Sequence, residues 1–155
     1  MPEDEGILVR EANESDLPAI EQLLANLIDT LDDAEGIDIE VALGTCRRLL
    51  RDATSHFLVA NMNRNPVGLI NFTIRQTVLH RSPSALIDEI VVAKDYQRKG
   101  VGRQLVLAAI AKCKALDCCE VEVSTEKTNA EAREFYRECG FKERGVLFEA
   151  DIEST

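Results

Sequence analysis

Apolar residues recur every three or four positions in several parts of the chain, the spacing that gathers them on one face of an α-helix. The two helical runs of the first third are made by Ile20, Leu23, Leu24, Leu27, Ile28 and Leu31 and by Ala42, Leu43, Cys46, Leu49 and Leu50. The same spacing predicts a helix over Val101–Leu116. Thr128-Asn129-Ala130-Glu131 has the form of a capping box and predicts the start of a fourth helix, which Gly140 ends in the left-handed conformation.

Other segments are rich in apolar and β-branched residues and predict β-strands. They are Ile7–Arg10, His56–Met62, Val67–Val78, Ala85–Ala93, Cys119–Thr125, Phe141–Glu143 and Val146–Ile152. The polar stretch Asn63–Pro66 predicts a hairpin turn between the second and third of these strands. Ala85–Ala93 is apolar almost throughout, as in a central strand that is covered on both faces. Helices and strands alternate in the second half, so we expect one mixed α/β domain over residues 1–155.

Composition narrows the classes of function. The chain has 18 basic and 28 acidic residues, a net charge of −10, which argues against binding to nucleic acid or to an anionic membrane surface. No apolar run approaches the ~20 residues that span a bilayer, and the acidic stretch Met1–Gly6 is unlike a secretory signal. The 5 cysteines and 2 histidines lack the spacing of a zinc site, so we expect no metal. The cysteines are interpreted as small buried apolar residues in a reducing, cytoplasmic environment.

The segment Asp95–Arg103 joins the predicted central strand to the next helix and contains Gly100 and Gly102. The first N–H groups of a helix lack partners within it, and the helix dipole places about half a positive charge there. Glycines let the backbone approach an oxyanion closely. Basic side chains in the same turn reverse the local charge: Arg98, Lys99 and Arg103. A phosphate site is therefore predicted. The Walker A sequence is absent, and Leu105 occupies the third glycine position of a dinucleotide fingerprint, so neither motif fits.

Gln97, Gly100 and Gly102 match the acyl-CoA signature Gln/Arg-x-x-Gly-x-Gly/Ala, and here the chain resembles the GNAT (Gcn5-related N-acetyltransferase) superfamily. The resemblance extends from the acidic strand Leu86–Val92 to the stretch Asn129–Phe141. It implies a mixed, mostly antiparallel sheet of six to seven strands, flanked by about four helices, with splayed central parallel strands. It also implies an enzyme that moves an acetyl group from acetyl-CoA to a primary amine by direct attack. A non-catalytic acyl-CoA-binding regulatory module is the alternative, because it would share the glycine turn.

The resemblance also implies which residues bind acetyl-CoA. The main-chain amides that would hold its pyrophosphate belong to Gln97, Arg98, Lys99, Gly100, Val101, Gly102 and Arg103. Val91 and Val92 would offer backbone groups to the pantetheine arm, which would lie beside the strand like an additional strand. Asn129 matches a position that commonly bonds the same arm, and a role in capping the helix is an equal alternative.

Two residues are candidates for catalysis. Glu89 places a charge in an otherwise apolar strand, which is costly unless the site is polar or functional, and it matches the position of a general base in some GNAT enzymes. A salt-bridged or solvated carboxylate is the alternative. In a regular strand Asp88 and Glu89 point to opposite faces. Tyr136 matches the usual family tyrosine that protonates the departing thiolate, and a core tyrosine is its alternative role.

The acceptor is expected to be an amine, and a cationic one would suit an acidic segment between the first two helices. This segment contains Asp29, Asp32, Asp33, Glu35, Asp38 and Glu40 and no basic residue. Such a segment would attract a polyamine, an aminoglycoside or a lysine side chain, although a solvated acidic loop has the same composition. Many similar proteins form homodimers, but no feature of the sequence requires one.

Overall fold

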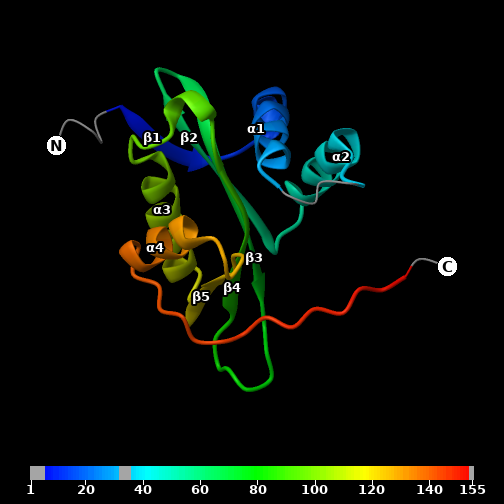
Figure 1. Ribbon diagram of the computed structural model, residues 1–155, viewed down its shortest axis with the longest axis vertical. Coiled ribbons are helices and arrows are strands. Elements are labelled where there is room, and N and C mark those ends of the chain that lie inside the picture. The colour runs from blue at the N-terminus through cyan, green and yellow to red at the C-terminus, as the bar shows by residue number, and fades with distance from the viewer. Residues whose placement is uncertain (1–5, 32–35, 154–155) are drawn as a thin grey trace. The chain divides into compact units, whose positions relative to one another are not determined.

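The computed structural model describes residues 6–31 and 36–153. These fall into two compact units, one ending at Val123 and the other beginning at Ser124. The helices of the first unit are α1 (Leu17–Asp29), α2 (Ile39–Leu49) and α3 (Val101–Ala115). Its strands are β1 (Ile7–Glu11), β2 (Ser55–Met62), β3 (Asn65–Arg75), β4 (Ser84–Val92) and β5 (Glu120–Val123) (Figure 1). The second unit contains α4 (Ala130–Glu138). No helix within the two described ranges is long and apolar enough to cross a membrane.

The first unit is built on a sheet with the strand order β1-β2-β3-β4-β5. All neighbours are antiparallel except β4 and β5, which are parallel. The loop between β2 and β3 is shorter than the predicted turn and consists of Asn63 and Arg64, with φ of 51° and 67°. Two successive left-handed residues are typical of a type I′ turn, whose twist matches that of the strands. Pro66 therefore belongs to β3 rather than to the turn.

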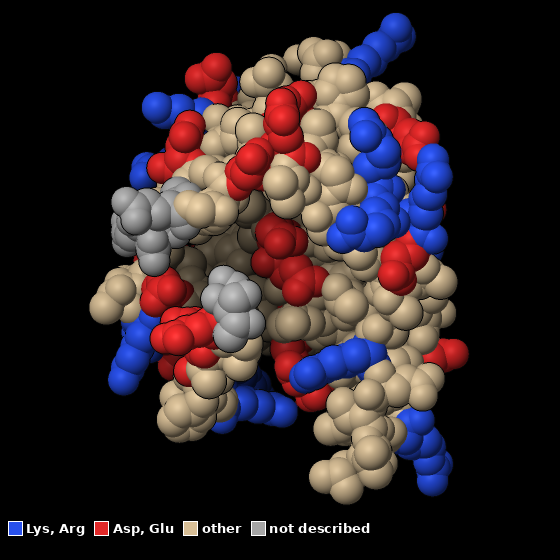
Figure 2. All heavy atoms as spheres, turned by 90° about the vertical axis from the view of Figure 1, so that its right-hand side faces the viewer, with Lys and Arg blue, Asp and Glu red and all other residues tan. Residues whose placement is uncertain are grey.

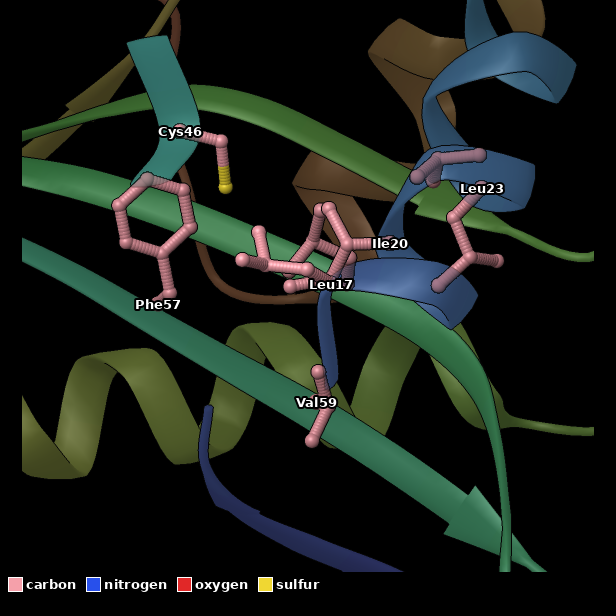
Figure 3. Close-up of a cluster of buried hydrophobic side chains, with 8 residues drawn as sticks. Leu17, Ile20, Leu23, Cys46, Phe57 and Val59 are labelled. Carbon is pink, nitrogen blue, oxygen red and sulfur yellow. The ribbon is translucent and has the colours of Figure 1, made fainter. Parts of the chain in front are cut away.

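Helices cover both faces of this sheet, with α3 on one face and α1 and α2 on the other (Figure 1). Gly68 of β3 gives α3 room to approach, because a Cβ atom there would lie 2.9 Å from side-chain atoms of both Val101 and Leu105. On the opposite face, apolar side chains of α1, α2 and three strands form a core cluster (Figure 3). The cluster comprises Leu17, Ile20, Leu23, Cys46, Phe57, Val59, Leu69 and Val91. β4 lies between β3 and β5 and is thus an internal strand, as predicted, but its residues Asp88 and Glu89 are exposed, so it is not covered along its whole length.

The pairing of β4 with its neighbouring strands changes in the middle of the strand. It pairs with β3 along its length, but the register shifts so that Asn71 faces Glu89 while Phe72 faces Ile87. Asp88 is thus the extra residue of a β-bulge. Pairing with β5 runs from Ser84 to Ile87 and ends there. Beyond Ile87, none of the described residues pairs with β4 on its β5 side, which fits the expected splaying of the parallel strands.

The second unit is centred on α4. Asn129 is its N-cap, and its side-chain Oδ1 accepts a hydrogen bond from the backbone N–H of Ala132 at 3.0 Å. The capping box predicted to begin at Thr128 is therefore wrong by one residue. Gly140 ends the helix with φ of 99°, as predicted, and the N–H of Phe141 donates to the carbonyl of Tyr136 at 3.0 Å. This bond belongs to a Schellman motif, which brings the rings of Tyr136 and Phe141 to a centroid distance of 5.7 Å.

The predicted fold class is confirmed, but the described sheet has five strands rather than six to seven. The difference lies after Gly140, where residues 141–153 contain no strand. Their apolar side chains are exposed, including Val146, Phe148 and Ile152. Strand propensity mainly reflects how well side chains pack against a neighbouring strand, and these residues have no partner strand. The predicted strands Phe141–Glu143 and Val146–Ile152 are therefore wrong for the described structure.

Candidate active site

The turn between β4 and α3 has the backbone geometry that the sequence predicts. Gly100 is the N-cap of α3 and adopts the left-handed conformation, with φ of 85° and ψ of 3°. The first helical hydrogen bond runs from the N–H of Gln104 to the carbonyl of Gly100 at 3.0 Å. The N–H groups of Val101 and Gly102 precede this bond and point out of the start of the helix. This is the arrangement that binds oxyanions at helix N-termini.

One side chain of the turn is hydrogen-bonded to β4, and three basic side chains in and after the turn are exposed. The Gln97 Nε2 donates to the carbonyl of Val92 at 3.3 Å and so links the turn to the end of β4. Arg98, Lys99 and Arg103 are exposed. The Lys99 ammonium lies 5.4 Å from the centre of the Tyr96 ring, a cation–π contact. The predicted positive charge thus surrounds the start of α3.

The unpaired edge of β4 begins near its bulge and leads towards this turn. The N–H of Ala93 donates to the carbonyl of Val67 in the neighbouring strand at 2.8 Å. Backbone groups alternate between the two edges of an antiparallel strand, so those of Val91 also face β3, while those of Ile90 and Val92 face the other edge. Of the predicted pair Val91 and Val92, only Val92 therefore presents its main chain to the open edge. Ile90, which the sequence analysis did not single out, does so as well.

Glu89 lies beside the bulge on the face of the sheet covered by α1 and α2. It pairs with Asn71, and the next pair on that face, Leu69 and Val91, belongs to the core cluster. The Glu89 residue is exposed at the surface of the sheet, while the atoms packed around its carboxyl partly desolvate it and raise its pKa to about 7, and the nearby charge of Asp88 contributes. A carboxyl with this pKa is well matched to accepting a proton near neutral pH.

The bulge also changes the direction of Asp88. The hydroxyl of Thr73 donates to the Asp88 carboxylate at 2.6 Å. Thr73 follows Asn71 by two residues on β3, so both lie on the same face of the sheet. Asp88 therefore shares a face with Glu89, whereas a regular strand would place the two on opposite faces. The expectation of opposite faces fails because the extra residue breaks the alternation.

Other groups around Glu89 come from α2 and β3. Cys46 of α2 is buried, and burial together with the charge of Glu89 raises the pKa of its thiol to about 11. Asn71, opposite Glu89, is buried as well. The sequence analysis missed Asn71, although an isolated amide within the apolar run Val67–Phe72 is a usable signal. The polar groups next to the Glu89 carboxyl thus come from two strands and one helix.

Tyr136 and Asn129, the remaining predicted site residues, both belong to the second unit. Tyr136 is half-buried, and its ring contacts that of Phe135 at a centroid distance of 5.2 Å. Burial raises the pKa of its phenol, with a smaller contribution from Cys139. The phenol therefore stays protonated at neutral pH and is able to donate a proton. Asn129 uses its Oδ1 to cap α4.

Acidic side chains occur on the side of the first unit where α1 and α2 lie, some of them set below the surrounding surface (Figure 2). From the acidic segment predicted to attract a cation, Asp29, Asp38 and Glu40 are described and exposed, while Asp32, Asp33 and Glu35 lie outside the described residues. Asp38 also has a structural role. Its Oδ1 caps α2 by accepting from the N–H groups of Glu40 at 2.8 Å and Val41 at 3.4 Å.

Comparison with known proteins agrees with this geometry. The model of the Acetyltransferase (GNAT) family matches residues 20–141. The chain belongs to the GNAT family of acetyltransferases, so the predicted resemblance is confirmed. Among curated relatives, the spermidine N(1)-acetyltransferase of Vibrio cholerae is 30% identical over 99 residues, which cover 63% of this chain and 55% of the relative. The chain spans about half or less of the length of the curated relatives it matches.

Solved structures share the fold. A possible acetyltransferase from Clostridium difficile 630 superposes with a TM-score of 0.85 at 23% identity, covering 97% of this chain and 100% of the other. The protein AAC(6')-Iy superposes with a TM-score of 0.80 at 21% identity, covering 94% of this chain and 98% of the other, and its structure contains the bisubstrate analog CoA-S-monomethyl-acetylneamine. At these identities the likeness establishes the fold.

Proposed function

We propose that this chain transfers an acetyl group from acetyl-CoA to a cationic primary amine by direct attack of the amine on the thioester. One observation carries the proposal: on β4, a backbone edge without a partner strand and a carboxyl with a pKa of about 7 occur within five residues of each other. The same strand is followed by the short 3₁₀ helix Lys94–Tyr96 and then by the left-handed residue Gly100. A binding groove and a proton acceptor are what this reaction needs.

The residues of the first unit fit acetyl-CoA as a substrate. The amides at the start of α3 and the cations around Gly100 suit the negative diphosphate, because a helix N-terminus stabilises negative charge. The backbone groups of Ile90 and the N–H of Val92 suit the amides of the pantetheine arm, since an extended ligand is able to bond to an open strand edge, whereas the Val92 carbonyl already accepts from Gln97. Asn129 is a further candidate for the same arm, although its Oδ1 already caps α4.

Glu89 is proposed as the general base. A lysine-type amine has a pKa of about 10.4 in water and is therefore mostly protonated at neutral pH. Glu89 takes a proton from the nitrogen, directly or through water, which frees the lone pair for attack on the carbonyl carbon. The N–C bond forms, the nitrogen releases the second proton that its positive charge represents, and the C–S bond breaks with departure of the CoA thiolate. A backbone N–H on the open edge near Val91, by alternation that of Ile90, is placed to stabilise the oxyanion.

Tyr136 is proposed as the acid. The departing thiolate needs a proton, and a simple thiol has a pKa of about 8.5, so a neutral phenol is a suitable donor. Replacing Tyr136 by Phe should lower turnover at least about tenfold while leaving the Kd for acetyl-CoA nearly unchanged, because only the hydroxyl is lost. Steady-state kinetics together with calorimetric titration of acetyl-CoA check this expectation. Unchanged turnover would remove Tyr136 from the mechanism.

The proposed acceptor class follows from charge and from the relatives. The exposed carboxylates Asp29, Asp38 and Glu40 favour a cation near α1 and α2. A curated relative is named a spermidine acetyltransferase, and several proteins of the same fold are named aminoglycoside acetyltransferases. Polyamines and aminoglycosides both present primary amines on strongly cationic molecules. We therefore propose this class ahead of a protein lysine.

The proposal is tested in two stages with the purified chain. Calorimetry should first detect binding of acetyl-CoA and of CoA. Release of free CoA is then measured with spermidine, sisomicin and a lysine peptide, and mass spectrometry identifies the product. We expect acceleration by at least one of the cationic amines. Binding of acetyl-CoA with only slow hydrolysis, not accelerated by any amine, would favour the acyl-CoA-binding module. No binding of either form of the coenzyme would overturn both functions.

A further inference from the structure

Asn71 of β3 carries an unsatisfied polar atom in the core of the first unit. Its side chain is only 3% exposed, and no group among the described residues donates a hydrogen bond to its Oδ1. The buried carboxylate of Asp16 shows the usual pattern, since it receives two bonds of 2.8 Å from Arg10 and a third from the backbone of Asn13. Buried acceptors are nearly always paired, because leaving one unpaired is unfavourable. The Asn71 oxygen therefore lacks the hydrogen-bond donor that a buried acceptor normally has.

The position of Asn71 indicates where that donor comes from. Asn71 and Glu89 are cross-strand partners, and partner side chains project from the same face of a sheet. Phe57 on β2 flanks Asn71 on its other side and belongs to the core cluster. The amide oxygen thus lies beside the Glu89 carboxyl on the face covered by α1 and α2. Two other titratable groups interact with Glu89: in addition to burial, the charge of Asp88 raises the pKa of Glu89, and the charge of Glu89 raises the pKa of the Cys46 thiol.

We propose that Asn71 binds the acceptor amine, its Oδ1 accepting one N–H of the nitrogen whose proton Glu89 removes. This inference rests on the proposed function and extends it to the acceptor. An amide oxygen is a pure acceptor, and a primary ammonium offers three N–H groups. One proton passes to the Glu89 carboxylate, while a second N–H stays bonded to Asn71. The lone pair then attacks the carbonyl carbon and the N–C bond forms. As the C–S bond breaks, the nitrogen loses its third proton and the departing thiolate gains one, so that CoA leaves as the thiol and the product amide keeps the N–H bonded to Asn71. Two acceptors on adjacent strands orient the nitrogen, as attack requires.

The closing experiment compares Asn71→Leu with the wild type, using spermidine and sisomicin as probe amines. Leucine is close to asparagine in size and removes the unpaired oxygen, so the Tm should stay equal or rise. The kcat/KM for the amine should fall about ten- to a hundredfold, mainly through a higher KM, because the lost bond already exists in the bound ground state. The Kd for acetyl-CoA should not change. Asn61→Leu is the matched control, since the Asn61 Oδ1 also lacks a partner among the described residues but lies on β2 opposite Pro66.

A second variant and a pH profile separate this role from others. Asn71→Asp keeps an acceptor oxygen and should retain more kcat/KM than Asn71→Leu. An equal loss in both variants, or a loss accompanied by a lower Tm, assigns Asn71 a structural role and overturns the inference. The kcat/KM of the wild type should fall at low pH as Glu89 is protonated. If this acid limb moves to lower pH in Asn71→Leu while the KM for the amine is unchanged, the Asn71 Oδ1 accepts a hydrogen bond from protonated Glu89. That result also overturns the inference. Wild-type kinetics in Asn71→Leu overturn the inference alone, whereas a wild-type chain that acetylates no amine overturns the proposed function as well.

Discussion

The two halves of β4 differ although they are one continuous strand. The first half, Ser84–Ile87, has partner strands on both sides, and three of its four side chains are buried. The second half, Asp88–Val92, pairs only with β3, begins with a bulge and carries two carboxylates. Backbone groups that are fully paired stabilise the sheet but have nothing left to offer a ligand. The unpaired half gives up part of that stabilisation and gains a surface that is able to bind one.

This comparison separates residues that hold the fold from residues proposed to act on a substrate. Substitutions in the first half should lower the free energy of unfolding and leave coenzyme binding intact. Substitutions in the second half and in the turn that follows should change binding or turnover more than folding. Four variants test this division.

The largest effect is expected for Glu89→Gln in the second half. Loss of the base should lower kcat/KM at pH 8 by about 10² to 10⁴, and the acid limb near pH 7 should disappear from the profile. An acid limb that persists in the variant would assign the limb to another group.

Glu89→Gln should lower activity but raise stability at alkaline pH. The pKa of Glu89 in the folded chain, about 7, is above its ordinary value of 4.5, so the folded state holds a proton that the unfolded state has already released between these values. The wild type therefore loses stability as the pH rises through this interval. Glu89→Gln should have a higher Tm than the wild type at pH 8 and a similar Tm at pH 5. A lower Tm at pH 8 would contradict a carboxyl that is costly to ionise.

Ile87→Ala tests the first half. Ile87 is 4% exposed, and truncating such a side chain costs about 2–5 kcal/mol through lost burial and the cavity left behind. Denaturant unfolding should show this loss, while the folded variant binds acetyl-CoA with the Kd of the wild type. A Kd that weakens in proportion to the lost stability would remove the division between the two halves.

Gly100→Ala should have a smaller effect. A non-glycine residue in the left-handed conformation costs about 1–2 kcal/mol, and relief of this strain would turn the first amides of α3 away from the ligand. The Kd for acetyl-CoA should rise about tenfold, as measured by calorimetry, since 1.4 kcal/mol corresponds to that factor. Gly6→Ala is the control: Gly6 also has a positive φ, of 100°, but precedes β1. The control should lose comparable stability without any change in Kd.

The smallest effect is expected for Asp88→Asn. Asp88 makes the lesser contribution to the raised pKa of Glu89, after burial, so removing its charge should move the acid limb of kcat/KM to lower pH by less than about one unit. The asparagine oxygen still accepts from Thr73, which keeps the bulge in place. A limb that stays where it is would show that the Asp88 charge does not reach the reacting carboxyl.

Local signals in the sequence were sufficient for the turn and for most elements. Glycine at the start of α3, the cations beside it and the glycine that ends α4 depend on residues close together in the chain, although the N-cap of α4 was predicted one residue too early. The bulge at Asp88 was not predictable, because it depends on how β4 aligns with β3, and the alternation rule therefore gave the wrong face for one carboxylate. The isolated amide of Asn71 was a local signal, but the sequence did not show its neighbour: Asn71 pairs with Glu89, 18 positions further along the chain. After Gly140 the composition favours strands, but a strand needs a partner that local sequence does not supply.

Helix α3 packs close to the sheet because Gly68 has no Cβ atom. Gly68 lies opposite Val92, the last residue of β4, and the side chains of Val101 and Leu105 occupy the space that an alanine would fill. Any larger residue at position 68 would push the first turn of α3 away from the end of β4. Gln97, in the turn before α3, is hydrogen-bonded to that strand end. The distance between the end of β4 and the start of α3, which together form the proposed coenzyme groove, is thus set by Gly68. This residue lies on the neighbouring strand and would itself touch no substrate.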